Sequence, residues 1–473
     1  MHRPFSPLRR SPLPGWLTAV ALTGLVLAAG ASGPHLDGVG NANFGVLHRP
    51  PPTNHTITHI VVLMMENHAF DNYFGAYCPS VGPSCPAAVH GYPAGLCVPL
   101  FPAQKQGACV TPFPFTAKNW SISAPMPHTN LTSHEAWNNG SMDGFYQAEN
   151  SGLTPFGYYN GSTAPLYWDL AEEFGLSDNF FSSTLSYSTP NHWYLLAGQA
   201  PAASFDLHLG AAYLTQAQNT TSVEDLLLGS HAPSWDYYDY ALPSWSQATS
   251  IHGNFAFGAY NYWNPQAAKQ ESYSRALSPH FVPNTQFFSD ARAGNLPNLA
   301  WVIPFSKESD HPPQNVTRAE SFVASVVDAV ETSPDWNSTA LFITWDDYGG
   351  FYDGVAPPTV GNQTLSFRVP LIVVSPYTSA GMVNHSQGYF ESLLHFMESS
   401  FGLGCITSRD CNAPLPNGFF NFSMSPRAPV LFSTTPTNWT YPYAPRAGGA
   451  DGTGWQIPEA FLADPNGDGV DVD

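Results

Sequence analysis

The stretch IVVLMMENHAFDNYFG, residues 60–75, decides the fold of this chain. Its apolar first part is typical of a parallel strand that is covered on both faces, and we expect this strand to run over roughly residues 56–65. The strand then ends on the polar residues Glu66 and Asn67, and Asp71 follows shortly after. Because ligands of open α/β sheets collect at the carboxyl ends of strands, these side chains predict a functional site.

The later half of the chain alternates between short apolar runs and helix-like segments. The runs NLAWVIPF (298–305), TALFITW (339–345) and VPLIVVS (369–375) are typical of buried strands. RAESFVASVVDAVETS (318–333) and GYFESLLHFMESSFG (388–402) are typical of helices. This alternation predicts an α/β fold, with a largely parallel central sheet sandwiched by helices.

Two further helices are expected earlier in the chain. One covers residues 165–178, and the other starts after Pro190, in HWYLLAGQ. Pro190 favours the first turn of a helix, so the hydroxyl of Ser188 or Thr189 would lie at a helix N-terminus, where backbone N–H groups favour an anion such as phosphate. A metal-bound hydroxyl can lose its proton there and attack phosphorus, although an N-cap serine is also a common structural feature.

Two of the expected strands end in clustered oxygen donors, Glu66-Asn67 and Asp346-Asp347. Burying several carboxylates together is costly because like charges repel in a low dielectric, and a divalent metal ion removes that cost. Carboxylates and an amide carbonyl suit a hard or borderline ion. Taken alone, the Asp pair also fits a turn into the following Tyr-Gly-Gly, and Glu66 fits a helix cap. Their joint position at two strand exits predicts a divalent-metal site.

Composition limits the function classes. With 473 residues, of which 43% are hydrophobic, the chain can bury a large core. It has 15 Lys and Arg against 35 Asp and Glu, a formal net charge of −20, so it lacks the basic face that a nucleic-acid partner requires. Only 11% of the residues are charged, which fits either work in acid or drift in a glycosylated secreted protein.

The two ends of the chain are expected to lie outside the catalytic part. The N-terminus combines a positive start, an apolar core too short to span a bilayer and a small-x-small cleavage site, which predicts a signal peptide. We expect no transmembrane segment after its removal, and therefore a secreted, extracellular protein. The tail ends in DPNGDGVDVD, which matches the start of a calcium loop but fits a solvated acidic tail better. The expected parts are the signal peptide (1–31), a linker (32–54), a catalytic domain (55–425) and a Pro/Gly-rich tail (426–473).

Six cysteines agree with export, and the lack of a Cys-x-x-Cys pattern argues for disulfides rather than zinc. Cys405 and Cys411 form a close pair that we expect to be bridged. The other four lie in a disulfide-rich loop insertion over residues 76–118, and their three alternative pairings stay open. These four are Cys78, Cys85, Cys97 and Cys109. Asn-x-Ser/Thr sequons along the chain predict a glycosylated exterior.

Three of the 17 histidines lie in segments that could meet a phosphate. His128 and His134 belong to PMPHTNLTSHEAWNNGSMDGFY, and His311 belongs to KESDHPPQ, in the loop after a predicted strand. A histidine near a strand exit can hold a phosphate oxygen, ligate a metal or protonate a leaving group. Each of the three, taken alone, is more often inert.

In combination, these segments resemble a known family. VVLMMENHAFDNYFG is similar to the ENRSFDHYFG opening of the phosphoesterase family that contains bacterial phospholipases C and secreted acid phosphatases. STLSYSTPNHWYLLAG resembles its nucleophile segment, and DHPP, SPDWNSTALFITWDDYGGFYDGVAPP and FRVPLIVVSPYTSAGMVNH resemble its later blocks. The similarity covers residues 55–425 in order, so this part is expected to be a phosphoesterase catalytic domain. The family belongs to the alkaline-phosphatase-like superfamily, and the resemblance therefore implies an α/β sandwich of that type.

The resemblance also implies roles for individual residues. Ser188 would be the nucleophile as well as a metal ligand, and His128 and His311 would contact the phosphate as catalytic residues. We further expect Asn191 and His134 to bind substrate. The implied ligands of the divalent metal ion are Glu66, Asn67, Ser188, Asp346 and Asp347.

The chain departs from the family pattern at a few positions. His68 replaces the arginine of the opening motif, which argues against His68 as a ligand. Asp347 takes the place of a glutamate, and Gly354 lies where the family has a histidine. Asp71 is interpreted as holding its loop in shape rather than touching substrate. These departures bear on substrate range more than on the core chemistry.

The predicted function is a secreted, metal-dependent phosphoric-ester hydrolase that forms a phosphoserine intermediate. Its substrate would be a phosphate-ester small molecule or a phospholipid. Acid phosphatase is favoured over phospholipase C for two reasons. Family phospholipases often carry additional C-terminal β-domains, whereas this sequence ends soon after the catalytic segments. Its net negative charge would also not attract it to anionic membranes. A catalytically inactive cell-surface glycoprotein on the same core is a third alternative, and the retention of Ser188 and both acidic pairs argues against it.

Overall fold

The computed structural model of this protein describes most of the chain between Thr56 and Phe432. The signal peptide, the linker, the calcium-like end of the tail, and Cys78 and Cys85 lie outside the described residues. Within the described part, no helix has both the length and the apolar character needed to cross a bilayer. The described residues are 56–77, 89–100, 108–116, 125–206, 211–228, 232–239, 265, 278–304 and 306–432.

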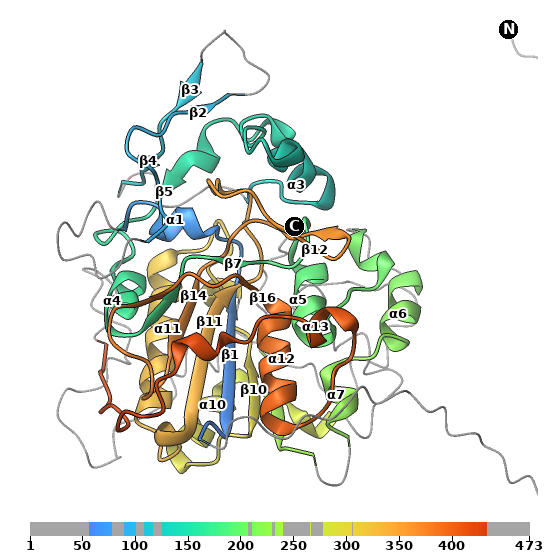
Figure 1. Ribbon diagram of the computed structural model, residues 1–473, viewed down its shortest axis with the longest axis vertical. Helices are drawn as coiled ribbons and strands as arrows, with labels where there is room; N and C mark the ends of the chain where they lie inside the picture. Colours follow the sequence, from blue (N-terminus) through green and yellow to red (C-terminus); the bar gives the residue numbers. More distant parts are fainter. Residues whose placement is uncertain are drawn as a thin grey trace, which may run out of the picture. The chain divides into compact units, whose positions relative to one another are not determined.

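A large mixed sheet forms the centre of the described structure (Figure 1). Its strand order is β15-β6-β14-β11-β1-β10-β8-β9, and all neighbours pair in parallel except β14, which is antiparallel to both β11 and β6. The prediction of a largely parallel sheet is therefore confirmed. The strands are β1 (His59–Met65), β6 (Gly175–Ser177), β8 (Trp235–Asp239), β9 (Phe281–Pro283), β10 (Leu299–Val302), β11 (Thr339–Trp345), β14 (Leu371–Val374) and β15 (Met382–Asn384).

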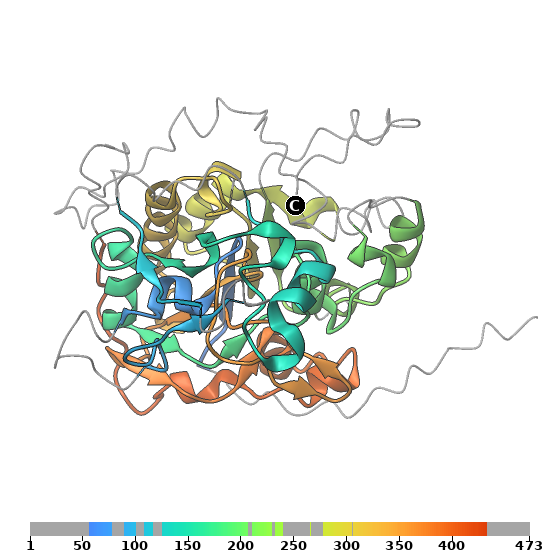
Figure 2. The same cartoon turned by 90° about the horizontal axis from the view of Figure 1, so that it is seen from above.

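Helices cover both faces of this sheet, as the sandwich prediction requires. In the view of Figure 2, α10 and α11 lie on one side of the sheet and α12 lies on the other. The apolar face of α11 and nearly all residues of α12 are buried, so burial of apolar surface holds the layers together. The α-helices are α1 (Phe70–Phe74), α3 (Asn130–Trp137), α4 (Pro165–Glu173), α5 (Ser188–Ala197), α6 (Ala211–Gln218), α7 (Val223–Leu226), α10 (Asn284–Ala293), α11 (Val316–Glu331), α12 (Phe390–Phe401) and α13 (Ser408–Cys411).

Short strand pairs lie outside the main sheet. They pair β2 with β3, β4 with β5, β12 with β13 and β16 with β7. Their bounds are β2 (Val98–Pro99), β3 (Cys109–Val110), β4 (Phe113–Pro114), β5 (Gly157–Tyr158), β7 (Phe180–Phe181), β12 (Thr359–Val360), β13 (Gln363–Thr364) and β16 (Gly388–Tyr389).

The register of the central strands positions the site. β1 lies between β11 and β10, and the last residue of β1, Met65, pairs with the last residue of β11, Trp345. Both strands are fully buried apart from the first residue of β1. The polar residues that follow the two strands, Glu66-Asn67 and Asp346-Asp347, therefore lie side by side at the carboxyl edge of the sheet.

One predicted helix is wrong in its extent. The helix expected over residues 165–178 ends at Glu173, and the chain continues as strand β6. A Cβ atom on Gly175 would lie 2.7 Å from the ring of Phe419, so only glycine lets the chain pack this closely. Pairing with β14 and β15 thus overrides the local helical preference. The helix expected after Pro190 begins earlier, at Ser188, and places Pro190 in its first turn.

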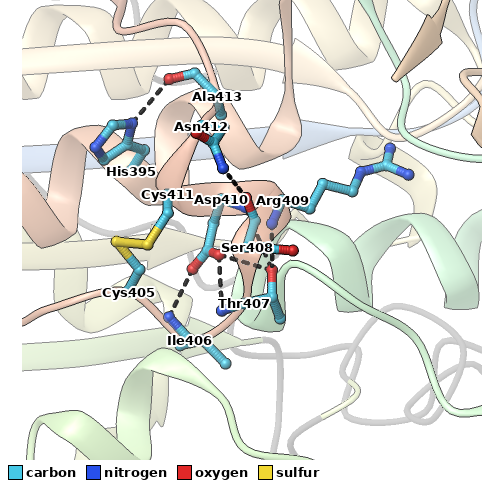
Figure 3. The surroundings of a disulfide bond; sticks show 10 residues. All are labelled: His395, Cys405, Ile406, Thr407, Ser408, Arg409, Asp410, Cys411, Asn412 and Ala413. Carbon is cyan, nitrogen blue, oxygen red and sulfur yellow. Dashed lines mark hydrogen bonds between the residues drawn. A yellow bond between two sulfur atoms is a disulfide. The ribbon is translucent and has the colours of Figure 1, made fainter. Parts of the chain in front are cut away.

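Two disulfides are present among the described residues. Cys97–Cys109 joins β2 to β3, which selects one of the alternative pairings in the disulfide-rich insertion. Cys405–Cys411 confirms the expected second bridge and closes the short segment that contains α13 (Figure 3). Thr407 caps this helix, and Asp410 accepts the backbone N–H groups of Ile406 and Thr407.

Candidate active site

A cup of buried oxygen donors lies where β1 and β11 leave the sheet. We use "the cup" for Glu66, Asn67, Asp346 and Asp347, all of which are fully buried. The backbone N–H of Asn67 donates to Asp346 Oδ1 over 2.8 Å and so ties the two strand exits together. The turn after Asp347 packs tightly over Asn67, since a Cβ on Gly349 would lie 2.0 Å from the Asn67 carbonyl oxygen. The structure therefore brings together both acidic pairs that were singled out in the sequence.

The hydroxyl of Ser188 reaches into the cup from the first residue of α5. Its Oγ lies 3.1 Å from Glu66 Oε2, 3.5 Å from Asn67 Oδ1 and 3.5 Å from Asp347 Oδ2. Thr189, the other candidate, has no hydrogen-bond partner for its buried Oγ1 among the described residues. The geometry therefore favours Ser188 over Thr189 as the residue that meets the cup.

His192 also faces the cup, although it is not among the site residues predicted from the sequence. It lies one helical turn after Ser188 on the same face of α5. Its Nε2 is 3.1 Å from Glu66 Oε1 and 3.8 Å from Asp346 Oδ2, and ligand atoms of these three buried residues lie within 4.8 Å of one another. The i, i+4 spacing from Ser188 is the signal in the sequence that could have identified it.

His128 also contacts the cup. Its Nδ1 lies 2.6 Å from the carbonyl oxygen of Met126, which can only accept, so Nδ1 carries the proton. In the neutral ring Nε2 then accepts from Asn67 Nδ2 over 2.9 Å, and it lies 4.0 Å from Asp347 Oδ2. His128 is thus held with a lone pair pointing toward the cup.

His311 is held in the same tautomer beside His128. Its Nδ1 lies 2.6 Å from the carbonyl oxygen of Pro312, and its ring centroid is 6.3 Å from that of His128. Both rings are buried. The structure therefore brings the two histidines with implied phosphate contacts next to each other.

Asp310 anchors the loop that carries His311. Its Oδ2 accepts three hydrogen bonds, from Tyr73 at 2.7 Å, Tyr167 at 2.9 Å and Trp345 Nε1 at 3.0 Å. Its backbone adopts φ of +80°, a conformation that costs energy for a residue other than glycine. These contacts outweigh that cost and fix the position of the neighbouring His311.

His68 points away from the cup, in agreement with the prediction that it is not a ligand. Its Nδ1 contacts Asn72 Oδ1 at 2.6 Å, and its Nε2 contacts the Asp310 carbonyl oxygen at 3.0 Å. The ring stacks on Phe351 at 4.8 Å, and burial lowers the pKa of His68. It is a packing residue between the cup loop and the Asp310 loop.

Asp71 holds its loop in shape, as expected from the sequence. Its Oδ2 accepts from the backbone N–H of Gly354, and its Oδ1 lies 3.0 Å from the guanidinium of Arg368. Arg368 is buried and also binds Asp353 at 3.0 Å. Burial, helped by repulsion from Asp353, raises the pKa of Asp71 to about 7.

The structure does not bring the two expected substrate-binding residues to the cup. His134 lies on the surface of α3, where its Nδ1 contacts the carbonyl oxygen of Asn130 one turn earlier. The side-chain amide of Asn191 forms hydrogen bonds with backbone groups of residues 183–187, the loop that precedes Ser188. Asn191 therefore fixes the loop that leads into the nucleophile position.

The donor set of the cup suits a divalent metal ion. Three buried carboxylates, one amide oxygen, one hydroxyl and one imidazole converge there. Asp346 Oδ2 is buried without a hydrogen-bond partner among the described residues, which is costly for an ionised carboxylate. The residues therefore fit a divalent metal, whose identity they do not select.

Comparisons with known proteins agree with this chemistry. A model of the Phosphoesterase family matches residues 57–404. The chain is 29% identical to the non-hemolytic phospholipase C of Burkholderia pseudomallei, over 75% of this chain and 56% of that protein. It is 27% identical to phospholipase C B of Mycobacterium tuberculosis, over 78% of each chain. The non-specific phospholipase C6 of Arabidopsis thaliana is 27% identical, over 70% of this chain and 64% of that protein.

Solved structures are more distant. A protein of the alkaline phosphatase superfamily from Vibrio parahaemolyticus has a TM-score of 0.35 at 10% identity, over 76% of this chain and 71% of that chain. The lipoteichoic acid synthase LtaP from Listeria monocytogenes has a TM-score of 0.37 at 9% identity, over 75% of this chain and 76% of that chain.

Proposed function

Because the chain belongs to the Phosphoesterase family, which makes it a phosphoric-ester hydrolase, we propose that it is a metal-dependent phospholipase C that cleaves the bond between glycerol and the phosphorylated head group of a phospholipid. The observation that carries the proposal is the 3.1 Å contact between Ser188 Oγ and Glu66 Oε2 inside a cup of carboxylates. A nucleophilic hydroxyl and an acidic metal cup are the two parts that such a reaction requires.

This proposal reverses the preference for acid phosphatase that the sequence suggested. That preference rested partly on the additional C-terminal β-domains that family phospholipases often carry, but the mycobacterial relative named phospholipase C B is matched over 78% of its own length. The names of the relatives therefore favour phospholipase C. Acid phosphatase remains the second candidate, because buried carboxyls with raised pKa values, such as Glu331 at about 8 and Asp328 at about 7, favour the folded state in acid.

The residues of the cup would perform the first half of the reaction. Glu66, Asn67, Asp346, Asp347 and Ser188 would hold a divalent metal ion, and the positive charge of that ion would favour the serine alkoxide and the developing phosphoryl charge. Ser188 Oγ transfers its proton to Glu66 Oε2 and attacks phosphorus. The bond between phosphorus and the oxygen of diacylglycerol then breaks. The product of this half-reaction is a phosphoserine with the head group still attached.

The two histidines would handle the protons of the leaving group and of water. His128 and His311 each carry their proton on Nδ1, so Nε2 is the nitrogen of each ring that would take up and release a further proton. In its protonated form one of them gives the Nε2 proton to the departing alcohol oxygen. The same nitrogen then accepts a proton from the water that attacks phosphorus, the bond between phosphorus and Ser188 Oγ breaks, and Glu66 Oε2 returns its proton to Oγ, which restores Ser188.

The two substrate classes are separated by a comparison of p-nitrophenylphosphorylcholine with p-nitrophenyl phosphate, across pH and with and without a chelator. Faster turnover of the choline diester, together with release of diacylglycerol from phosphatidylcholine, supports phospholipase C. Faster turnover of the monoester, with a maximum in acid, supports acid phosphatase.

The inactive-glycoprotein alternative is tested by Ser188→Ala, with Thr189→Ala as the matched control from the same helical turn. Loss of more than about a thousandfold in kcat for Ser188→Ala alone supports the serine mechanism. No turnover of either substrate by the wild-type protein would remove the enzyme proposal.

A further inference from the structure

We propose that His90, Asp178 and His385 form a second metal site, which takes a borderline transition-metal ion of the Zn²⁺ type. The site shares no residue with the cup. It would join the segment around His90 to the edge of the central sheet.

The three side chains converge on one carboxylate. His385 Nδ1 lies 2.9 Å from both oxygens of Asp178, and His90 Nδ1 lies 3.3 Å from Asp178 Oδ2. One ligand atom from each residue can be chosen so that all lie within 4.8 Å of one another. The two imidazole rings are 4.9 Å apart between centroids. Small movements of two surface rings are enough to place a metal between the three atoms.

Two of the ligands, Asp178 and His385, follow neighbouring parallel strands, as the acidic pairs of the cup do. Asp178 directly follows β6, and His385 directly follows β15, while the last residues of these strands, Ser177 and Asn384, pair in a parallel register. The two residues thus leave the sheet side by side at neighbouring strand exits. Because β14 is antiparallel to both β6 and β11, β6 runs in the same direction as β11. The second site therefore lies at the same carboxyl edge of the sheet as the cup.

The backbone around the site is fixed by a buried arginine. Arg368 Nη1 donates to the carbonyl oxygens of His90 at 2.7 Å and of Asp178 at 2.9 Å. The backbone N–H of His90 also donates to Asp178 Oδ2 over 2.9 Å, and Asn179 Nδ2 holds the His385 carbonyl at 3.0 Å. The main chain at all three ligand positions is thus set before any ion binds, which lowers the entropic cost of binding.

Burial and chemistry both suit a metal with an open coordination position. The Asp178 side chain is fully buried, whereas the side chains of His90 and His385 are 62% and 45% exposed. Both Nδ1 atoms face the carboxylate, so each neutral ring can carry its proton on Nε2 and offer Nδ1 as a ligand. Two imidazole nitrogens and one carboxylate oxygen are a common zinc donor set, with water in the remaining position. A simple His–Asp hydrogen bond would need only one of the two histidines.

The test is the zinc stoichiometry of the full chain, stripped with a chelator and then measured by equilibrium dialysis and isothermal titration. His385→Ala and His90→Ala are each compared with the wild type and with His280→Ala. His280 is the matched control, because it is a partly exposed histidine whose Nδ1 lies 3.5 Å from a single aspartate, Asp236.

We expect each site variant to bind one zinc ion fewer than the wild type, or to bind it more than about tenfold more weakly, and the control to match the wild type. A second readout is the visible absorption of bound Co²⁺, which reports tetrahedral coordination independently of enzymatic activity. Equal zinc binding by the wild type and both site variants would overturn the proposal. Loss of catalysis on its own would not support it, since the cup is a separate site.

Discussion

Ser188 and His192 lie one turn apart on α5, and each contacts a different oxygen of Glu66 over 3.1 Å. The carboxylate of Glu66 therefore receives the nucleophile and an imidazole from the same helix face. This geometry links the start of α5 to the exit of β1. It also makes His192 a candidate metal ligand, or a residue that orients Glu66.

Replacing His192 with alanine should weaken metal binding by about 10–100-fold and lower kcat/KM in parallel, because Glu66 loses its imidazole partner. Metal titration of the stripped protein and steady-state kinetics at saturating metal measure the two effects. His280→Ala is the control for loss of a histidine elsewhere. Unchanged metal affinity together with unchanged kcat/KM would show that the contact has no functional role.

Replacing Arg368 with methionine should destabilise the fold by about 3–5 kcal/mol at pH near 8, because Asp71 and Asp353 would be left as buried, unpaired charges. Since the pKa of Asp71 is already raised to about 7, protonation in acid should relieve part of this loss. Urea unfolding at two pH values measures the difference.

Glu173→Gln is the matched control for Arg368→Met, because it changes an ion pair whose carboxylate is 42% exposed and should cost less than about 1 kcal/mol. A penalty for Arg368→Met that is equal in acid and in base would contradict the electrostatic explanation.

The sequence could predict those parts of the site that follow from strand exits. The cup could be predicted because Glu66-Asn67 and Asp346-Asp347 each follow a continuous apolar run, and parallel strands end at the same edge of a sheet. The hydrogen bond between Asp71 and Arg368 could not be predicted from the sequence, because it joins residues 297 positions apart that only the packed fold brings together. His192 was missed because it lies in a run of buried helix residues, where a histidine looks like part of the core.

The fold should become less stable as pH rises, owing to buried acids on α11. Burial raises the pKa of Glu331 from 4.5 to about 8, so the folded state holds this proton where the unfolded chain has already lost it. Stability from this group is complete below pH 4.5 and is lost as pH rises through about 8. Glu331→Gln should flatten the pH dependence of the unfolding free energy by up to about 5 kcal/mol between these limits. Urea unfolding of the chelator-treated protein across this range is the measurement, and an unchanged slope would refute the assignment.

Replacing Asn191 with alanine distinguishes a positioning role from the substrate contact that the sequence suggested. The amide of Asn191 ties together the backbone of residues 183–187, which leads directly into Ser188. If it positions the nucleophile, kcat should fall by about 10–100-fold with little change in KM, because a displaced Ser188 loses its attack geometry. A rise in KM at unchanged kcat would instead show that Asn191 binds substrate. His134→Ala, which alters an exposed residue of α3, should change neither parameter if its ring contacts only its own helix.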